Sequence, residues 1–167
     1  MSQPRFQKVL SIETSCDDTS VSVVDSKGQV LSILSADQDL VHKPFGGIVP
    51  EIASRNHTMT LLPLLQQTLE RSGLGWVEID GIVVTSRPGL IGSLLVGVMT
   101  AKSLAMSFEK KFLGVNHLEG HLLAPFLRDE KYQPPDNFDY PYVALAVSGG
   151  HSQLYLVKGV GQYEVIG

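Results

Sequence analysis

The chain has 167 residues, of which 43% are hydrophobic and 18% charged, and its net charge is −4. This length can bury one core, so it fits one domain or a domain with the beginning of another. Because the net charge is negative, the chain cannot bind nucleic acid through an overall positive charge. An RNA substrate would need a local basic patch or a partner protein. No run approaches the roughly 18 uninterrupted apolar residues of a membrane helix, and the N-terminus lacks the apolar core of a signal peptide. We therefore expect a cytoplasmic protein without membrane contact, and the single Cys16, which cannot form an internal disulfide, agrees with a reducing compartment.

The first part of the chain predicts three antiparallel strands. Apolar residues at 8–12 and 21–24 flank a polar turn at 13–20, which is the pattern of a β-hairpin. A second turn at 25–28 leads into a third apolar stretch at 30–35. Three strands in succession therefore start a sheet.

The middle of the chain alternates helices and strands. The pattern first predicts a loop at 36–49, a helix at 50–72 and a strand at 79–85. A loop at 86–93 then leads into a helix that runs to about 108. A strand at 112–115 and a helix from His117 follow. Pro63 lies inside the first helix and should kink or divide it. Strands alternating with helices imply parallel crossovers, so we predict an α/β fold with a mixed sheet.

The last part of the chain repeats the pattern of its opening. A polar, proline-containing stretch at 128–141 resembles a linker between lobes. A strand at 142–147, a polar turn at 148–152 and a strand at 153–157 then copy the first hairpin in kind. We therefore predict a first lobe at residues 1–130, a linker at 131–141 and the start of a second lobe at 142–167. A domain usually needs about 50 residues or more, so we expect a truncated or half-length protein.

Both hairpin turns are candidates for binding an anion. Ser148, Gly149 and Gly150 can expose successive backbone N–H groups that cradle a phosphate, although a plain tight turn would use the same residues. In the first turn, Asp17 and Asp18 can bind a metal-nucleotide or polarise an attacking amine. The alternative is that these two aspartates cap local N–H groups.

A third candidate anion site is the loop that carries Pro88 and Gly89 in front of a predicted helix. Unpaired N–H groups and the helix dipole favour negative charge at such a position. The loop matches neither the Walker pattern nor the dinucleotide-binding fingerprint. The alternative is that Gly92 and Gly97 only permit close helix packing.

The histidines of His117-Leu118-Glu119-Gly120-His121 are the candidate metal ligands. Four residues apart on a helix, both imidazoles project from one face, although such a pair can also be a helix-capping and core pair without metal. Glu119 lies roughly 200° around the helix from His117, so the general base of a zinc protease is misplaced. No third ligand stands out nearby, and we expect neither His57 nor His151 to be one.

Five segments together resemble, in order and spacing, the N-terminal half of the TsaD type of tRNA threonylcarbamoyladenosine synthase. They are Ile12 to Thr19, Gly46 to His57, Pro88-Gly89-Leu90, His117 to His121 and Val147 to Ser152. Coverage is essentially the whole chain. The resemblance implies the two-lobed fold shared by actin, sugar kinases and Hsp70, which is ribonuclease H-like, with a phosphate-facing hairpin opening each lobe.

The resemblance also implies an activity. The family transfers the threonylcarbamoyl group from threonylcarbamoyl-adenylate, which derives from ATP, to the exocyclic amine of the adenosine 3′ to the anticodon in tRNAs that read A-starting codons. The partners implied are tRNA, an inactive paralogue subunit and a small ATPase subunit of the bacterial complex. One divalent metal per subunit is implied, with Fe²⁺ favoured and Zn²⁺ possible.

Site residues carried over by position follow from the same resemblance. His117 and His121 would be metal ligands, Asp17 and Asp18 would be catalytic residues near the phosphates and the attacking amine, and the substrate would contact the segment Ala146, Val147, Ser148, Gly149 and Gly150. The metal would act as a Lewis acid, and the turn amides would hold the adenylate.

Three positions depart from patterns common in the family. Many bacterial members carry glutamate in place of Asp18 and glycine in place of Arg87, whereas archaeal members place a tyrosine ligand where Ala146 stands. The third metal ligand, an aspartate, belongs to the absent half, so we expect the isolated chain to be inactive and to bind metal weakly. The alternatives are a non-catalytic paralogue or scaffold subunit, which lacks the histidine pair, and a metalloendopeptidase, which the placement of Glu119 disfavours.

Overall fold

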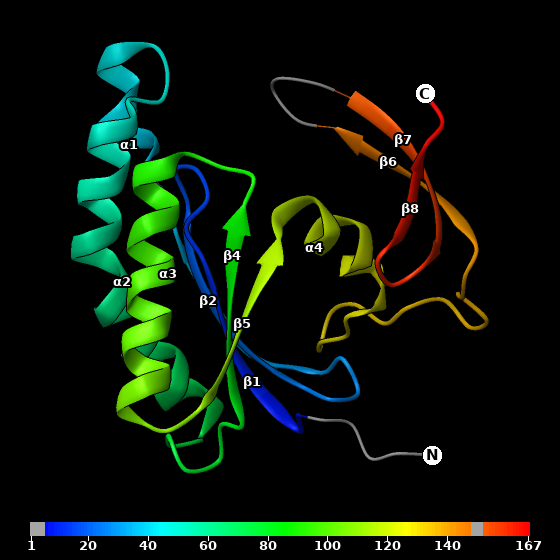
Figure 1. Cartoon of the computed structure of the whole chain (residues 1–167), viewed down its shortest axis with the longest axis horizontal. Helices are drawn as coiled ribbons and strands as arrows, with labels where there is room; N and C mark the ends of the chain where they lie inside the picture. The colour runs from blue at the N-terminus through cyan, green and yellow to red at the C-terminus, as the bar shows by residue number, and fades with distance from the viewer. Residues whose placement is uncertain (1–5, 148–151) are drawn as a thin grey trace. The chain divides into compact units, whose positions relative to one another are not determined.

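The structure, a computed structural model, describes residues 6–147 and 152–167 (Figure 1). Its elements in chain order are β1 (Lys8–Glu13), β2 (Thr19–Asp25), β3 (Val30–Ala36), α1 (Asp39–His42), the 3-10 helix η1 (Lys43–Phe45), α2 (Pro50–Ser72), β4 (Gly81–Arg87), α3 (Ile91–Ser107), β5 (Lys111–Asn116), α4 (His117–Leu123), the 3-10 helix η2 (Ala124–Phe126), β6 (Tyr142–Val147), β7 (Ser152–Gly159) and β8 (Gln162–Val165). The chain divides into two compact units, Met1–His117 and Leu118–Gly167. The lobe and linker ranges predicted from the sequence stay a prediction.

The first unit is built on a five-stranded mixed sheet in the order β3-β2-β1-β4-β5. β1 pairs antiparallel with β2 from Lys8 opposite Asp25 to Glu13 opposite Ser20, which confirms the predicted hairpin. β2 also pairs antiparallel with β3. β1, β4 and β5 are parallel neighbours, so their carboxyl ends lie at one edge of the sheet.

Helices α2 and α3 lie side by side and cover one face of this sheet (Figure 1). The strands contribute alternate apolar residues and the helices contribute residues at helical spacing, as burial of a single face requires. The buried core consists of Leu10, Ile12, Val21, Val23, Leu61, Leu65, Leu69, Ile79, Ile82, Val84, Ala101 and Ala105. This core fixes the strand ends that carry the polar residues described below.

Helix α2 is one continuous helix, so Pro63 does not divide it, and the alternative that Pro63 kinks it stays a prediction. Pro63 is exposed, and water can therefore bond the carbonyl that loses its partner one turn earlier. The same helix exposes Met59 and Leu62 at 75% and 56% of their surface. Some of the apolar side chains of α2 therefore face away from the core.

Three further details differ from the sequence expectations. The region expected as a loop at 36–49 contains α1 and η1. Strand β4 begins two residues later than the predicted strand and ends at Arg87. Strand β8 was not predicted, because its four residues alternate polar and apolar side chains too briefly to form a periodic signal.

The second unit contains a three-stranded antiparallel sheet in the order β6-β7-β8. The predicted strands on either side of the polar turn are therefore confirmed as an antiparallel pair. Leu122, Tyr155 and Val157 form its small core, against which one face of β6 packs. The opposite face of β6 presents Val143, Leu145 and Val147, which are 59%, 64% and 68% exposed.

No helix within the described parts of the chain is both long and apolar enough to span a membrane.

Candidate functional site

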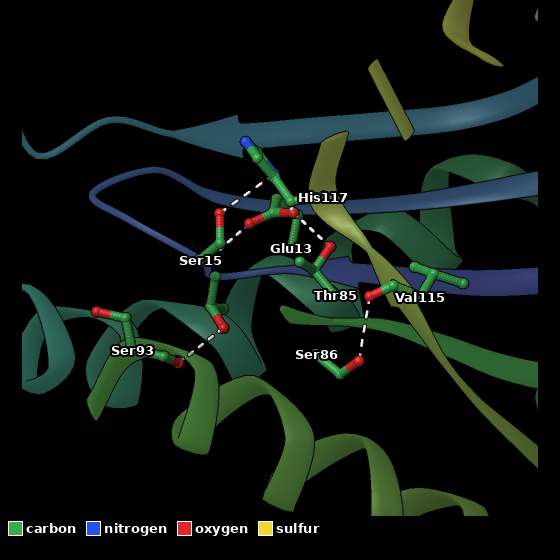
Figure 2. A network of polar contacts seen from close by, with 8 residues as sticks. Glu13, Ser15, Thr85, Ser86, Ser93, Val115 and His117 are labelled. Carbon is green, nitrogen blue, oxygen red and sulfur yellow. Dashed lines mark hydrogen bonds and ion pairs between the residues drawn. The ribbon is translucent and has the colours of Figure 1, made fainter. Parts of the chain in front are cut away.

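A polar cluster lies where the parallel strands of the first unit end. Glu13 is the last residue of β1, Thr85 lies near the end of β4, and His117 follows β5 directly. The Glu13 carboxylate accepts hydrogen bonds from the Thr85 hydroxyl and the Ser15 backbone N–H. Its Oε2 also lies 3.1 Å from Nδ1 of His117 (Figure 2). Sites in α/β sheets characteristically form at this carboxyl edge.

Hydrogen bonds keep Glu13 ionised in this cluster. Burial by itself raises the pKa of the Glu13 carboxyl, but the hydrogen bonds from Ser15, Thr85 and His117 together lower it below its ordinary value. A carboxylate that accepts several donors is stabilised in its charged form. Glu13 therefore faces His117 as an anion at neutral pH.

The polar turn between β1 and β2 is clamped onto the start of α3. The Thr14 hydroxyl donates to the Ser93 carbonyl at 2.8 Å, and the Leu90 N–H donates to the Ser15 carbonyl at 2.7 Å. A Cβ on Gly89 or Gly97 would lie 2.5 Å from Ser15 O or 2.3 Å from Thr14 Oγ1. Both glycines therefore permit the close approach.

Gly92 and Gly97 both support the alternative that the glycines of α3 permit close packing. Gly97 leaves room for Thr14, whereas Gly92 leaves room for Ser54 of α2, whose Cβ would lie 3.2 Å from an added one. Both positions are therefore explained by close packing. The Leu90 N–H is used by the Ser15 carbonyl, so this part of the helix start binds the protein's own backbone.

His57 of α2 supports the same turn from the other side. Its side chain is fully buried, with Nε2 lying 3.0 Å from the Cys16 carbonyl and Nδ1 lying 2.7 Å from the Thr19 hydroxyl. Nε2–H must donate to the carbonyl, so Nδ1 accepts from the hydroxyl. Both ring nitrogens are thus used to fix the loop that carries the two aspartates.

Asp17 and Asp18 lie at the outer part of this turn. Asp17 lines an open cavity of about 350 Å³, together with Asp39, His42, Lys43, Gly47 and Ile48. Burial raises the pKa of the Asp18 carboxyl, and the Asp17, Asp37 and Asp39 carboxylates raise it further. Asp18 therefore binds a proton more readily than an isolated aspartate.

Cys16 precedes these carboxylates. Burial raises the pKa of its thiol to about 11, and a hydrogen bond and the charge of Asp17 contribute to the shift. The thiol is therefore protonated at neutral pH, which argues against a nucleophilic role.

Helix α4 carries the two predicted metal ligands. It begins at His117, and His121 follows one turn later, so both belong to one side of the helix. Within residues 6–147 and 152–167, no three His, Cys, Asp or Glu side chains are grouped as a metal site requires. The structure thus positions two candidate ligands on one helix, and the expected third ligand stays a prediction.

Glu119 has a partner within the second unit. The hydroxyl of Tyr163 in β8 donates to its carboxylate. Burial raises the pKa of Tyr163 to about 12, and the bond to Glu119 adds to this shift. Glu119 is therefore used to hold β8, which further disfavours its role as the general base of a protease.

The predicted substrate-binding segment is only partly visible. Ala146 packs against the small core of the second unit, whereas Val147 is 68% exposed. Ser148, Gly149, Gly150 and His151 lie outside the described residues. Their predicted role at the adenylate therefore stays a prediction.

Comparisons with known proteins decide the family. Residues 29–167 match the family model described as TsaD, tRNA N6-adenosine threonylcarbamoyltransferase. The chain belongs to the TsaD family. The family match includes α4 with both histidines, and it confirms the resemblance found from the five sequence segments.

Two curated TsaD relatives carry the same name, tRNA N6-adenosine threonylcarbamoyltransferase. The protein of Bdellovibrio bacteriovorus is 59% identical over 162 residues, which are 97% of this chain and 47% of the relative. The protein of Anaeromyxobacter dehalogenans strain 2CP-C is 48% identical over 160 residues, which are 96% of this chain and 46% of the relative. The chain thus spans about half the length of these TsaD relatives.

A solved structure supports the fold of this TsaD chain. YeaZ from Pseudomonas aeruginosa is 18% identical, with a TM-score of 0.57 over 96% of this chain and 64% of that one. At this identity the likeness concerns the fold alone. The predicted α/β fold class with a mixed sheet is confirmed.

Glu13 and Thr85 were not predicted as parts of the site. In the sequence Glu13 only begins a polar turn, although a carboxylate at the end of a buried strand is a recognisable signal. Thr85 gave no signal of its own, since threonine is common in strands. Only the parallel pairing of β1, β4 and β5 brings them to His117.

Proposed function

We propose that this chain forms the first lobe of an enzyme that transfers a threonylcarbamoyl group from threonylcarbamoyl-adenylate to tRNA. The acceptor is the exocyclic amine of the adenosine 3′ to the anticodon in tRNAs that read A-starting codons. The observation that carries the proposal is the TsaD family match, which runs through α4 and both histidines.

His117 and His121 would hold a divalent metal, Fe²⁺ by preference and Zn²⁺ as the alternative. The donor set fits this assignment, because imidazole nitrogens suit both metals and the two rings share one side of α4. The metal would supply Lewis acidity toward an oxygen of the substrate. A third ligand is needed to complete the coordination.

The polar turn would serve the transfer chemistry. In this step the amine nitrogen bonds to the carbamoyl carbon, the bond to the adenylate oxygen breaks and AMP leaves. Asp17 and Asp18 would lie near the phosphate and the amine. The raised pKa of Asp18 suits it to accept the proton that the amine loses. The segment from Ala146 to Gly150 would hold the adenylate.

The remaining partners follow from the resemblance to the TsaD family, and charge and exposed surface are compatible with them. With a net charge of −4, the chain needs help to hold tRNA, and we place this activity in the cytoplasm with the inactive paralogue and the small ATPase as companions. Apolar side chains on α2 and α3 support a protein partner there. They are Met59, Leu62, Leu95, Met99 and Met106, which are exposed by 53% or more.

An assay of threonylcarbamoyladenosine formation tests the proposal. A chain of the relatives' full length that contains these 167 residues should form the product from threonylcarbamoyl-adenylate and tRNA when its companions and ATP are present, whereas the 167-residue chain alone should not. His121→Ala should lower product formation by at least tenfold. Glu70→Gln, an exposed change on α2, serves as the control and should leave it unaltered. Equal activity of wild type and His121→Ala would refute the metal role.

A further inference from the structure

Glu13 and His117 form a hydrogen-bonded pair at the carboxyl edge of the five-stranded sheet. Glu13 Oε2 lies 3.1 Å from Nδ1 of His117, and both side chains are about one third exposed or less, at 29% and 32%. The Ser15 hydroxyl lies 3.3 Å from the same ring nitrogen. All three residues belong to the first unit.

Two hydrogen-bond donors besides His117 hold the Glu13 carboxylate. The Ser15 backbone N–H donates to Oε1, and the Thr85 hydroxyl donates to Oε2 (Figure 2). An ionised carboxylate has only acceptors to offer, so Nδ1 of His117 must carry the proton that it shares with Oε2. In a neutral imidazole the lone pair then lies on Nε2.

The strands make this arrangement rigid. Glu13 and Thr85 lie on the parallel neighbours β1 and β4, and His117 follows the next parallel neighbour, β5. The Ser86 hydroxyl donates to the Val115 carbonyl at 3.1 Å and so ties β4 to β5 just before His117. A Cβ on Gly114 would lie 3.0 Å from Ser86 Oγ, so glycine there permits this bond.

We propose that Glu13 is the positioning residue of His117, holding it in the Nδ1–H tautomer so that Nε2 is presented to a divalent metal. Histidines that ligate metals characteristically donate their other ring N–H to a carboxylate, which fixes the tautomer and the ring orientation. This inference rests on the proposed metal role of His117. It goes beyond that role by assigning a function to Glu13, with Thr85 and the Ser15 N–H holding the carboxylate.

Replacing Glu13 by glutamine gives a sharp test of the tautomer. The glutamine side chain keeps one oxygen as an acceptor and replaces the other oxygen of glutamate with an NH₂ donor. The Ser15 N–H cannot reverse its direction, so the NH₂ group must occupy the Oε2 position and donate toward His117. Nδ1 then becomes an acceptor, and the ring proton moves to Nε2.

Nitrogen-15 NMR of the metal-free chain at about pH 8, above the ordinary imidazole pKa of about 6.5, reads this tautomer directly. The His117 signals are assigned by their loss in His117→Gln. We expect a protonated Nδ1 in wild type and in the control Glu70→Gln, and a protonated Nε2 in Glu13→Gln. A protonated Nε2 in wild type overturns the inference. An unchanged tautomer in folded Glu13→Gln overturns it as well.

A zinc titration of the same proteins separates this inference from the proposed function. Glu13→Gln should bind Zn²⁺ about 10- to 100-fold more weakly than wild type, because the lone pair on Nε2 is lost. Glu70→Gln should bind as wild type does. If the tautomer changes as expected but His117→Gln leaves zinc affinity unaltered, Glu13 still positions the ring and the metal role fails. If His117→Gln abolishes binding and Glu13→Gln leaves it unchanged, the metal role holds and the positioning role fails.

Discussion

The imidazole of His57 donates from Nε2 to the carbonyl of Cys16, 3.0 Å away, and thereby fixes the turn between the first two strands to helix α2. The ring is fully buried, and its other nitrogen is hydrogen-bonded by Thr19. A single side chain thus links the loop of Asp17 and Asp18 to the core of the first unit.

Replacing His57 by alanine should destabilise the chain. The change leaves a cavity and removes the hydrogen bonds of His57 to the Cys16 carbonyl and to the Thr19 hydroxyl, which keeps its contact with Thr60, so the free energy of unfolding should fall by about 2–4 kcal/mol. Thr58→Ala on the exposed side of the same helix is the control and should change it by less than about 0.5 kcal/mol. Urea denaturation measures both, and equal losses would contradict the role of His57.

Replacing Gly97 by alanine should loosen the turn at Thr14. The new methyl group would meet Thr14 Oγ1 at 2.3 Å, so Thr14 must shift and lose its bond to the Ser93 carbonyl. We expect a loss of about 1–3 kcal/mol in unfolding free energy. Gly120→Ala, with no atom of residues 6–147 or 152–167 within 4 Å of the added methyl group, is the matched helix control and should raise the unfolding free energy by about 0.5–1 kcal/mol.

A double variant identifies the source of this strain. Thr14→Ala removes the hydroxyl that the new methyl group would meet, so Gly97→Ala should cost less in the Thr14→Ala background than in wild type. Thermal unfolding of the four proteins measures the coupling. Strictly additive losses would show that the methyl group meets something other than Thr14.

The lowered pKa of Glu13 predicts a pH dependence of stability. Since the folded-state pKa lies below the ordinary carboxyl value of about 4.3, ionised Glu13 stabilises the fold above that value. This contribution is lost as the pH falls through the folded-state pKa. The difference in unfolding free energy between wild type and Glu13→Gln should therefore shrink between about pH 5 and pH 2. A difference that stays constant over this range would rule out the ionised carboxylate as its source.

Cys16 should react slowly with thiol reagents. With a pKa of about 11, the thiol forms far less thiolate at neutral pH than an ordinary cysteine, and alkylation should be slower than that of a free thiol by on the order of a hundredfold. Asp17→Asn removes a neighbouring charge and should increase the rate. Alkylation by iodoacetamide, followed by mass spectrometry, measures both rates, and an ordinary rate in the folded wild type would contradict the shifted pKa.

Much of the fold was predictable, because the pattern of apolar residues reports burial directly. The strands β1, β2 and β3 and the helices α2 and α3 all follow from it. The site was predictable only where its signal is local, as with the spacing of His117 and His121. The contact of Glu13 with His117 joins residues 104 positions apart, and only the strand order reveals it. Likewise, His57 is a polar residue among apolar helix positions, and its burial depends on partners from the distant turn.

The open face of β6 affects how this chain behaves when it is produced alone. Val143, Leu145 and Val147 present alternate apolar side chains to water, while the other face of the strand packs on the small aromatic core. Flat, apolar strand surfaces favour self-association at high protein concentration. Threonine at these three positions has a high preference for strands and would keep the backbone pairing with β7 while lowering the tendency to aggregate. A soluble form suited to spectroscopy can therefore be designed without touching Glu13, His117 or the turn between β1 and β2.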